Sequence, residues 1–473
     1  MKTIAVTIPF GMSARNLLRS DFFKTMKDKS RVVIFSPFST DAAFRQEFGG
    51  EHVFFEPLEF KSGLLEKVVR RIVDPVETWA FTKRTQIKTL LIYRDWLRAQ
   101  RPLRYLRIRL LALLFGNRCF VGPLRLLYRR LLRHDAYAQV FSRYNVDLLF
   151  VTHLFNLADQ QVAVSARDAG VPIIGMPHSW DNLTSKSGIR QGTNPDPGRT
   201  IPVRFDRMVV WNGIQRQELK DYYGYKDDEI FTSGIPQFDA YARREKILTR
   251  SEFLKQAGGD PQKKTILYAA GTPQYMRHQD EVVDVLIEIV RSGRLPEPVQ
   301  LVVRHHPNRM AIESLKSLEA KYKNDPSIIF SHPPLLYTAL SDRVWTAGRG
   351  DEYDLAHTLA ASDVVITMAS TITLDASAFD RPIINIVFDG RKEEPYFDSL
   401  KKTMEFTHYA KITETGAFVS VHNAGELEAA LSRYLSNPGF ESRERATLLK
   451  RVTGAVDGLA GKRIGEFLLD FVR

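Results

Sequence analysis

The stretch from Ala361 to Asp389 most constrains the fold of this chain. It runs from a short apolar segment, Asp363–Thr367, through a hydroxyl-rich turn and a helical segment to a second apolar segment, Ile383–Phe388. This order predicts strand, turn, helix and strand, which is one βαβ step of a parallel sheet. The turn of such a step lies at the carboxyl end of its strand, where ligands bind. Ser370 and Thr371 in this turn can donate to a phosphate, or can simply cap the helix.

The chain is long enough for two domains. It has 473 residues, of which 44% are hydrophobic and 26% charged, a composition typical of globular proteins. A second series of strand and helix patterns begins at Thr265, after a charged and then Gly- and Pro-containing junction at 240–263. We therefore predict two Rossmann-like doubly wound α/β domains, 1–250 and 251–473, that face each other across a cleft. A last helical stretch, at about 426–472, is expected to cross back to the first domain.

Cysteine content and the amino-terminal sequence indicate the compartment. The single cysteine, Cys119, excludes an internal disulfide framework and suits a reducing compartment. The opening Met1–Val6 resembles the start of a signal peptide, but Pro9, Gly11 and Arg15 interrupt it, so we expect a buried strand there. No run of 18 or more apolar residues is present in the sequence. We therefore expect a cytoplasmic protein.

The segment 64–135 has a helical period and is strongly basic. Between Trp96 and His134 it contains ten arginines and no acidic residue, nearly the net charge of +12 of the whole chain. The arginines alternate with Leu, Ile, Tyr and Phe, which is typical of amphipathic helices at membrane surfaces. The alternatives are an ordinary helix packed on the core and a nucleic-acid-binding surface, but no nucleic-acid-binding module accompanies the segment. We expect it to hold the chain as a peripheral protein on the anionic inner face of a membrane.

A polar loop, Pro177–Lys186, follows a predicted strand of the first domain. His178 is our first candidate for a general base, because the unperturbed pKa of histidine lies near neutral. Asp181 can instead be the base, or can orient His178. Asn182 and Lys186 are expected to contact the acceptor or a phosphate. The competing interpretation is a loop held by internal hydrogen bonds.

Three loops of the second domain each follow a predicted strand and offer hydrogen-bond donors and one potential cation. Such groups suit an anionic ligand such as a nucleotide diphosphate. The loops are not rich in carboxylates, so we expect neither a metal nor a cofactor, only a nucleotide-activated donor as substrate. His305 is expected to point away from the ligand and to be structural. The residues expected to bind the donor are Gly271, Thr272, His306, Pro307, Ser370, Thr371 and Asp375.

These segments resemble the CDP-glycerol glycerophosphotransferase superfamily. The stretches that carry the resemblance are Asp363–Asp375, Asp380–Ile384, Ile266–Ala269, Arg304–Pro307 and Gly234–Asp239, and the His178 loop with Lys186 is similar to the histidine loop of that family. The resemblance covers about residues 170–390.

The resemblance implies a fold and a set of roles. The fold is GT-B, in which two Rossmann-like domains hold the nucleotide mainly through the C-terminal one, and transfer proceeds without a bound metal. It further implies that His178 is the base, that His306 contacts the donor phosphate, and that Ser370 and Thr371 bind donor phosphates.

Two departures from the family pattern affect the expected donor. Met368–Thr371 stands where the family usually has Asp-Tyr-Ser-Ser, and Pro236–Gln237 stands where it has Pro-Arg. Similar GT-B enzymes of bacterial surface-polysaccharide synthesis use nucleotide sugars. We therefore expect first a glycosyltransferase that moves a sugar from a nucleotide sugar to a glycan or lipid-linked acceptor. The alternatives are a CDP-polyol phosphotransferase and a non-catalytic, membrane-bound partner in polysaccharide assembly.

Overall fold

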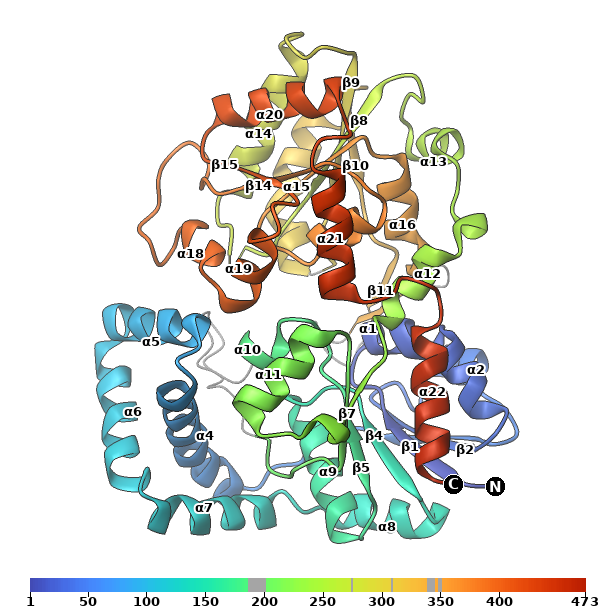
Figure 1. The fold of residues 1–473 in the computed structure, drawn as a ribbon, viewed down its shortest axis with the longest axis vertical. Helices are drawn as coiled ribbons and strands as arrows, with labels where there is room; N and C mark the ends of the chain where they lie inside the picture. The colour runs from blue at the N-terminus through green and yellow to red at the C-terminus, as the bar shows by residue number, and fades with distance from the viewer. Residues whose placement is uncertain (186–200, 274, 308, 338–344, 348–350) are drawn as a thin grey trace. The chain divides into compact units, whose positions relative to one another are not determined.

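The chain forms two structural units, each built on its own parallel sheet (Figure 1). The computed structural model describes residues 1–185, 201–273, 275–307, 309–337, 345–347 and 351–473. Unit 1 comprises Met1–Pro236 and Leu459–Arg473, and unit 2 comprises Gln237–Gly458. The boundary therefore lies at Pro236, before the predicted junction, and the C-terminal segment returns to unit 1.

The sheet of unit 1 has the strand order β3-β2-β1-β4-β5-β6-β7, and all its pairs are parallel. Its central strands are continuous apolar runs because both faces of a parallel sheet are covered by helices. Every residue of β1 and of β4 is buried. The strands are β1 (Thr3–Thr7), β2 (Arg31–Ser36), β3 (Val53–Pro57), β4 (Leu148–Val151), β5 (Ile173–Gly175), β6 (Arg207–Val210) and β7 (Ile230–Thr232).

The helices of unit 1 begin and end at recognisable capping residues. The side chain of Asn156 accepts hydrogen bonds from the first turn of α9, and Gly224 ends α11 with a φ of +68°. The helices described are α1 (Gly11–Ser13), α2 (Asp21–Lys27), α3 (Ala42–Phe48), α4 (Leu64–Thr85), α5 (Lys88–Gln100), α6 (Pro102–Phe115), α7 (Arg118–Leu131), α8 (Asp135–Tyr144), α9 (Leu157–Asp168), α10 (Asn182–Ser185), α11 (Gly213–Tyr223) and α22 (Ala460–Phe471).

The sheet of unit 2 repeats the topology of unit 1, with the order β10-β9-β8-β13-β14-β15 and parallel pairing throughout. The stretch from Ala361 to Asp389 forms the predicted βαβ step, as β13, α17 and β14. A separate antiparallel pair joins β11 (Leu335–Tyr337) to β12 (Trp345–Ala347). The strands of the sheet are β8 (Lys264–Ala269), β9 (Val299–Arg304), β10 (Ile328–Ser331), β13 (Val364–Thr367), β14 (Ile383–Ile386) and β15 (Val419–Val421).

Helices flank the second sheet as well. The stretch predicted as one last helix is three helices, because Pro438 and Gly439 end the first and Gly454, at a φ of +71°, ends the second. The helices described in unit 2 are α12 (Asp239–Ala242), α13 (Arg250–Ala257), α14 (Gln279–Arg291), α15 (Arg309–Tyr322), α16 (Asp351–Ala361), α17 (Ile372–Ala378), α18 (Lys401–Met404), α19 (Thr407–Thr413), α20 (Ala424–Ser436) and α21 (Ser442–Thr453).

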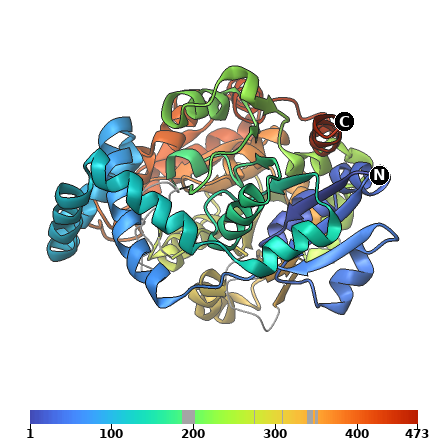
Figure 2. The same ribbon diagram turned by 90° about the horizontal axis from the view of Figure 1, so that it is seen from below.

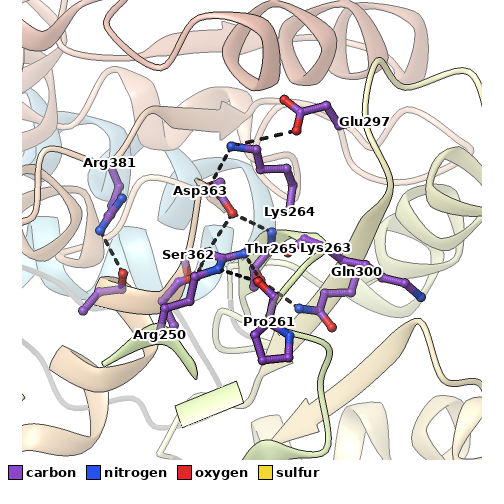
Figure 3. Close-up of polar contacts among 12 residues, drawn as sticks. Arg250, Pro261, Lys263, Lys264, Thr265, Glu297, Gln300, Ser362, Asp363 and Arg381 are labelled. Carbon is purple, nitrogen blue, oxygen red and sulfur yellow. Dashed lines mark hydrogen bonds and ion pairs between the residues drawn. The ribbon is translucent and has the colours of Figure 1, made fainter. Parts of the chain in front are cut away.

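A polar network closes the amino-terminal edge of the second sheet (Figure 3). The Arg250 guanidinium pairs with Asp363 at 2.9 Å and donates to backbone carbonyl oxygens, including that of Lys263. The Asp363 carboxylate accepts from the backbone N–H of Thr265 at 2.7 Å and lies 3.5 Å from the Lys264 ammonium. The network therefore ties β8 to the start of β13, at the edge opposite the strand ends where ligands bind.

The basic segment forms helices α4 to α7, a layer beside the unit-1 sheet (Figure 2). The helix α4 packs against both α6 and α7, and the rings of Trp79 and Tyr105 meet at 5.7 Å. In the part of the chain that the structure describes, no single helix is long and apolar enough to span a membrane. The pair Pro102–Phe115 and Cys119–Leu131 meets that length and composition only when its two members are taken together across a bend of 104°.

Candidate functional site

Both sheets have a topological switch point where ligand sites of such folds are found. The strand order reverses between β1 and β4 in unit 1 and between β8 and β13 in unit 2. Ligands of open parallel sheets bind beyond the carboxyl ends of the strands at such a point. The predicted loops follow β5 in unit 1 and β8, β9 and β13 in unit 2, at or next to these points.

In unit 1, three side chains that follow two neighbouring strands surround His178. Its ring stacks on that of His153 at 5.1 Å with an interplanar angle of 23°, and Phe10 lies within 6.2 Å of both rings. The Ser13 hydroxyl lies 3.5 Å from His178 Nδ1. The half-buried His178 is thus held by groups that follow β1 and β4, which our sequence analysis did not select. His153 lies directly after an apolar run, and this position could have marked it as a candidate site residue. The position points to contact with His178 only once β4 and β5 are known to be neighbouring strands.

The rest of the His178 loop is fastened by its own hydrogen bonds. The buried Asn182 accepts from the backbone N–H of Ser179 at 3.1 Å and donates to Asp181 at 3.3 Å. The Asp181 carboxylate also accepts from the Ser185 hydroxyl. These bonds give Asn182 and Asp181 a part in shaping the loop, as the competing interpretation expected. Lys186 lies outside the described residues.

A buried carboxyl group, Asp159, lies beneath this site. It accepts a hydrogen bond from the Thr7 hydroxyl at the end of β1, and Thr7 in turn accepts from the backbone N–H of Thr152 at 3.1 Å. Asp159 is fully buried, and this desolvation raises its pKa to about 8 although the bond from Thr7 acts against it. The carboxyl group is therefore mostly protonated at neutral pH. Asp159 thus ties α9 to the end of β1. The residues that follow this strand end in the sequence are among those that surround His178.

In unit 2, the three predicted donor loops lie at adjacent strand ends, and two of them contain a buried polar atom that has no partner among the described residues. Among the described residues, Thr272 Oγ1 and His306 Nδ1 are buried and have no hydrogen-bond partner. Buried polar atoms in folded proteins are nearly always satisfied, so each of these atoms is a candidate for a ligand or water contact. Gly271 allows Met368 to approach closely, since a Cβ at this position would lie 2.4 Å from the Met368 side chain.

His306 is neutral rather than cationic at neutral pH. Desolvation of the half-buried ring lowers its pKa to about 4. The prediction of one cation among these loops is therefore wrong for His306, because desolvation of its ring is not offset by any charged group among the residues that the structure describes. A neutral imidazole still donates one hydrogen bond and accepts another. Pro307 follows directly and restricts the backbone at this strand end.

The hydroxyl-rich turn after β13 carries Ser370 and Thr371 at the start of α17. Thr371 occupies the capping position, yet its side chain makes no capping hydrogen bond, so the simple capping interpretation does not describe it. Asp375 behaves differently from the other predicted donor residues. It is 2% exposed, and its carboxylate accepts from the Tyr241 hydroxyl at 2.6 Å and from Gln237 at 3.1 Å. These contacts join α17 to the first residues of unit 2.

A family model decides what kind of protein this is. The model of CDP-Glycerol:Poly(glycerophosphate) glycerophosphotransferase matches residues 140–470, well over half of the chain. The chain belongs to this family. The resemblance stated from the sequence is confirmed, and the glycerophosphotransferase-family chain is a transferase.

Individual relatives agree with this assignment. The chain is 26% identical over 196 residues to the teichoic acid glycerol-phosphate primase of Bacillus spizizenii, a match that covers 40% of this chain and 42% of the primase. The match thus spans less than half the length of that relative.

Solved structures establish the fold alone. The wall teichoic acid polymerase TagF aligns with a TM-score of 0.51 at 12% identity, over 100% of this chain and 88% of that one. The UDP-GlcNAc 2-epimerase of Neisseria meningitidis bound to UDP-GlcNAc aligns with a TM-score of 0.55 at 11% identity, over 99% of this chain and 100% of the other. The predicted GT-B fold class is therefore confirmed.

Proposed function

We propose that this glycerophosphotransferase-family chain transfers glycerol phosphate, or a closely related polyol phosphate, from a CDP-polyol to a hydroxyl of a glycan or lipid-linked acceptor in cell-envelope polymer synthesis. The observation that carries the proposal is the family match over residues 140–470, which includes the His178 loop and all three donor loops of unit 2. It favours the polyol-phosphate alternative over sugar transfer, our first expectation from the sequence, and over a non-catalytic role.

The reaction needs one base at the acceptor. The acceptor oxygen attacks the phosphorus that carries the polyol, the bond from this phosphorus to the CMP oxygen breaks, and CMP leaves with the electron pair. A phosphodiester forms, and His178 accepts the proton of the attacking hydroxyl. The stacking of His178 on His153 and its contact with Ser13 support this role, because they fix the direction of the ring.

The donor phosphates are assigned to the loops of unit 2. Thr272 and His306 supply buried atoms that have no hydrogen-bond partner among the described residues, and Ser370 and Thr371 supply hydroxyls at the neighbouring strand end. A neutral His306 contributes a directed hydrogen bond rather than a charge. Asp375 acts here as a positioning residue, since its carboxylate is held by Tyr241 and Gln237.

Release of CMP from CDP-glycerol, measured with the wild type and two variants, tests the proposal. We expect His178→Ala to lower turnover about 10²- to 10⁴-fold while CMP and CDP still raise the melting temperature, because a base is lost and the donor loops are untouched. His306→Ala should weaken the stabilisation by nucleotides. The exposed His422, replaced by Ala, serves as the matched control and should behave as the wild type.

The same assay separates the rival functions. Turnover of UDP-sugars without turnover of CDP-glycerol would return the assignment to a sugar transferase. The absence of any nucleotide-dependent stabilisation would favour the non-catalytic partner. Normal turnover by His178→Ala would remove His178 as the base.

We also propose that α6 and α7 bind an anionic membrane surface, where a lipid-linked acceptor would lie. Leu103 is 83% exposed and Leu113 is 72% exposed, which is unusual for apolar residues of a helix. Both helices also contain several arginines, as interfacial helices of peripheral proteins do. The other exposed apolar residues of these helices are Leu106, Leu110, Leu114, Phe120, Leu126 and Leu127.

Flotation with anionic liposomes measures this membrane contact. We expect Leu103→Asp with Leu113→Asp to reduce the bound fraction at least tenfold, because each change places a charge in the acyl region. Phe440→Asp, at an exposed aromatic residue of unit 2, is the control and should float as the wild type. Equal flotation of all three proteins would contradict the proposal.

A further inference from the structure

A second cluster of potential ligands lies in unit 2, within one βαβ step. His305 follows β9, Glu319 lies on the connecting helix α15, and His332 follows β10. The strands β9 and β10 pair in parallel with Ser331 opposite Arg304, so His305 and His332 are the next residues at neighbouring strand ends. Their rings stack at 4.2 Å with an interplanar angle of 13°. The fold thus brings two imidazoles and one carboxylate together without a long loop.

We propose that His305, Glu319 and His332 bind a divalent transition-metal ion, with Zn²⁺ as the preferred occupant. One ligand atom from each residue lies within 4.8 Å of the other two. Imidazole and carboxylate together suit Zn²⁺, and two histidines with one glutamate form a known type of three-ligand zinc set. None of the three residues is among those assigned to the donor, and the proposal is compatible with the expectation that transfer itself uses no metal.

The two histidine–glutamate distances, each to a different oxygen of Glu319, are close to those that a tetrahedral ion requires. Ligand atoms about 2.0–2.2 Å from such an ion lie roughly 3.4 Å apart. The His305 Nε2 to Glu319 Oε2 distance is 3.5 Å, and the His332 Nε2 to Glu319 Oε1 distance is 2.9 Å. Ligation by both rings requires one of the stacked rings to turn. The side chain of His332 is 44% exposed, so it has room to do so.

The state of His305 supports a ligand role. Its side chain is 1% exposed, and within the described part of the chain neither ring nitrogen has a hydrogen-bond partner. A buried imidazole whose ring nitrogens lack hydrogen-bond partners is costly by itself, and a bound ion removes that cost.

An ion can reach this site from solvent, and its binding would affect the neighbouring strand end. The exposed His332 opens the cluster to solvent, and Glu319 also lines an open cavity of about 370 Å³ together with Lys323 and Phe330. Because His305 directly precedes His306, an ion held here would fix the strand end that carries the donor-loop histidine. We therefore regard the three residues as positioning residues.

Titration of the chelator-treated full chain with Zn²⁺ and with Co²⁺ tests this site. The expected result is saturation at one ion per chain, a rise in melting temperature with Zn²⁺, and the visible absorption bands of tetrahedral Co²⁺. We expect His332→Ala and Glu319→Gln to weaken binding at least tenfold and to remove these bands. His332→Ala keeps the test valid if replacement of the buried His305 prevents folding.

A histidine with two nearby carboxylates provides the matched control. His278 lies 3.0 Å from Glu394 and 3.9 Å from Glu281 on the surface of unit 2. His278→Ala should bind Zn²⁺ as the wild type does. The proposal is overturned if the wild type shows no saturable binding, if His332→Ala and Glu319→Gln bind as tightly as the wild type, or if His278→Ala removes the binding.

Discussion

Asp159 lies fully buried directly beneath the residues that surround His178, and its pKa of about 8 makes folding sensitive to pH. Between the ordinary carboxyl pKa near 3.8 and about 8, the folded chain holds a proton that the unfolded chain has lost. The free energy of unfolding therefore falls as pH rises through this window, by up to about 1.4 kcal/mol per pH unit, and levels off above it.

We predict that Asp159→Asn removes this contribution to the pH dependence. The amide can accept from Thr7 as the carboxyl does, and it does not ionise. Urea unfolding of wild type and variant is measured from pH 5 to pH 9. The free energy of unfolding of the variant, relative to that of the wild type, should rise steadily up to pH 8. Asp228→Asn, at an exposed position, is the control and should run parallel to the wild type. Parallel curves for Asp159→Asn would show that the carboxyl is ionised when buried.

Several residues that carry the family resemblance serve the fold rather than the ligand. Asp363 closes the strand network at the amino-terminal edge, and Asp375 is held by Tyr241. Asp380 has a φ of +50°, and its carboxylate binds the fully buried guanidinium of Arg445. The motif therefore marks a segment at a strand end, but residue type alone could not separate a candidate ligand-binding group from one that stabilises the turn beside it.

The sequence could predict the loops at the strand ends, but not the contacts that their side chains make. Polar residues directly after apolar runs identified the His178 loop and the three loops of unit 2. The partners of His178 could not be predicted, because Phe10, Ser13 and His153 come from loops whose proximity depends on strand order. The burial of Asp159 could not be predicted either, since an acidic residue on a helix is normally exposed.

At the level of elements, the network around Arg250 holds β8 and β13 in place (Figure 3). We predict that Arg250→Ala lowers the free energy of unfolding by about 1–3 kcal/mol, because Asp363 loses its guanidinium partner and several backbone carbonyls lose their donor. The shift of the urea midpoint measures this loss. Arg294→Ala breaks the more exposed pair with Glu428 and should cost less than about 1 kcal/mol. Similar losses of stability in both variants would show that the network stabilises the protein no more than an exposed ion pair does.

Strand prediction followed the degree of burial. The fully buried β13 and β14 were predicted nearly at their observed bounds, because both faces of these strands need apolar residues. The edge strands β3, β10 and β15 were not predicted, since several of their residues are only partly buried. Periodicity also predicted the helical segment at 64–135, but not its division into α4, α5, α6 and α7.

At the level of the whole molecule, α22 joins the C-terminal segment to unit 1. Its Gly465 lies against α2, and a Cβ there would be 3.0 Å from the Thr25 side chain. We predict that Gly465→Val lowers the stability of unit 1 by about 1–3 kcal/mol, because the added methyl groups push the helices apart. Melting followed by circular dichroism measures the loss, while nucleotide binding at low temperature should persist, since the donor loops belong to unit 2.

A glycine in open space provides the comparison for this variant. Gly213 begins α11, and a Cβ there would meet nothing within 4 Å. Gly213→Val should therefore change the melting temperature little. A loss as large as that of Gly465→Val would mean that glycine flexibility, rather than close packing, explains both.

The return of α22 to unit 1 also sets the order in which the chain can mature on the ribosome. The face of α2 that α22 covers is made early, yet its covering helix emerges only after all of Gln237–Gly458 has been synthesised. At about 5–20 residues per second, that interval is roughly 10 to 45 s. Unit 2 can complete its fold in this time, whereas unit 1 keeps an uncovered apolar face. The nascent first unit is therefore the stage of synthesis at which chaperone binding would protect this protein most.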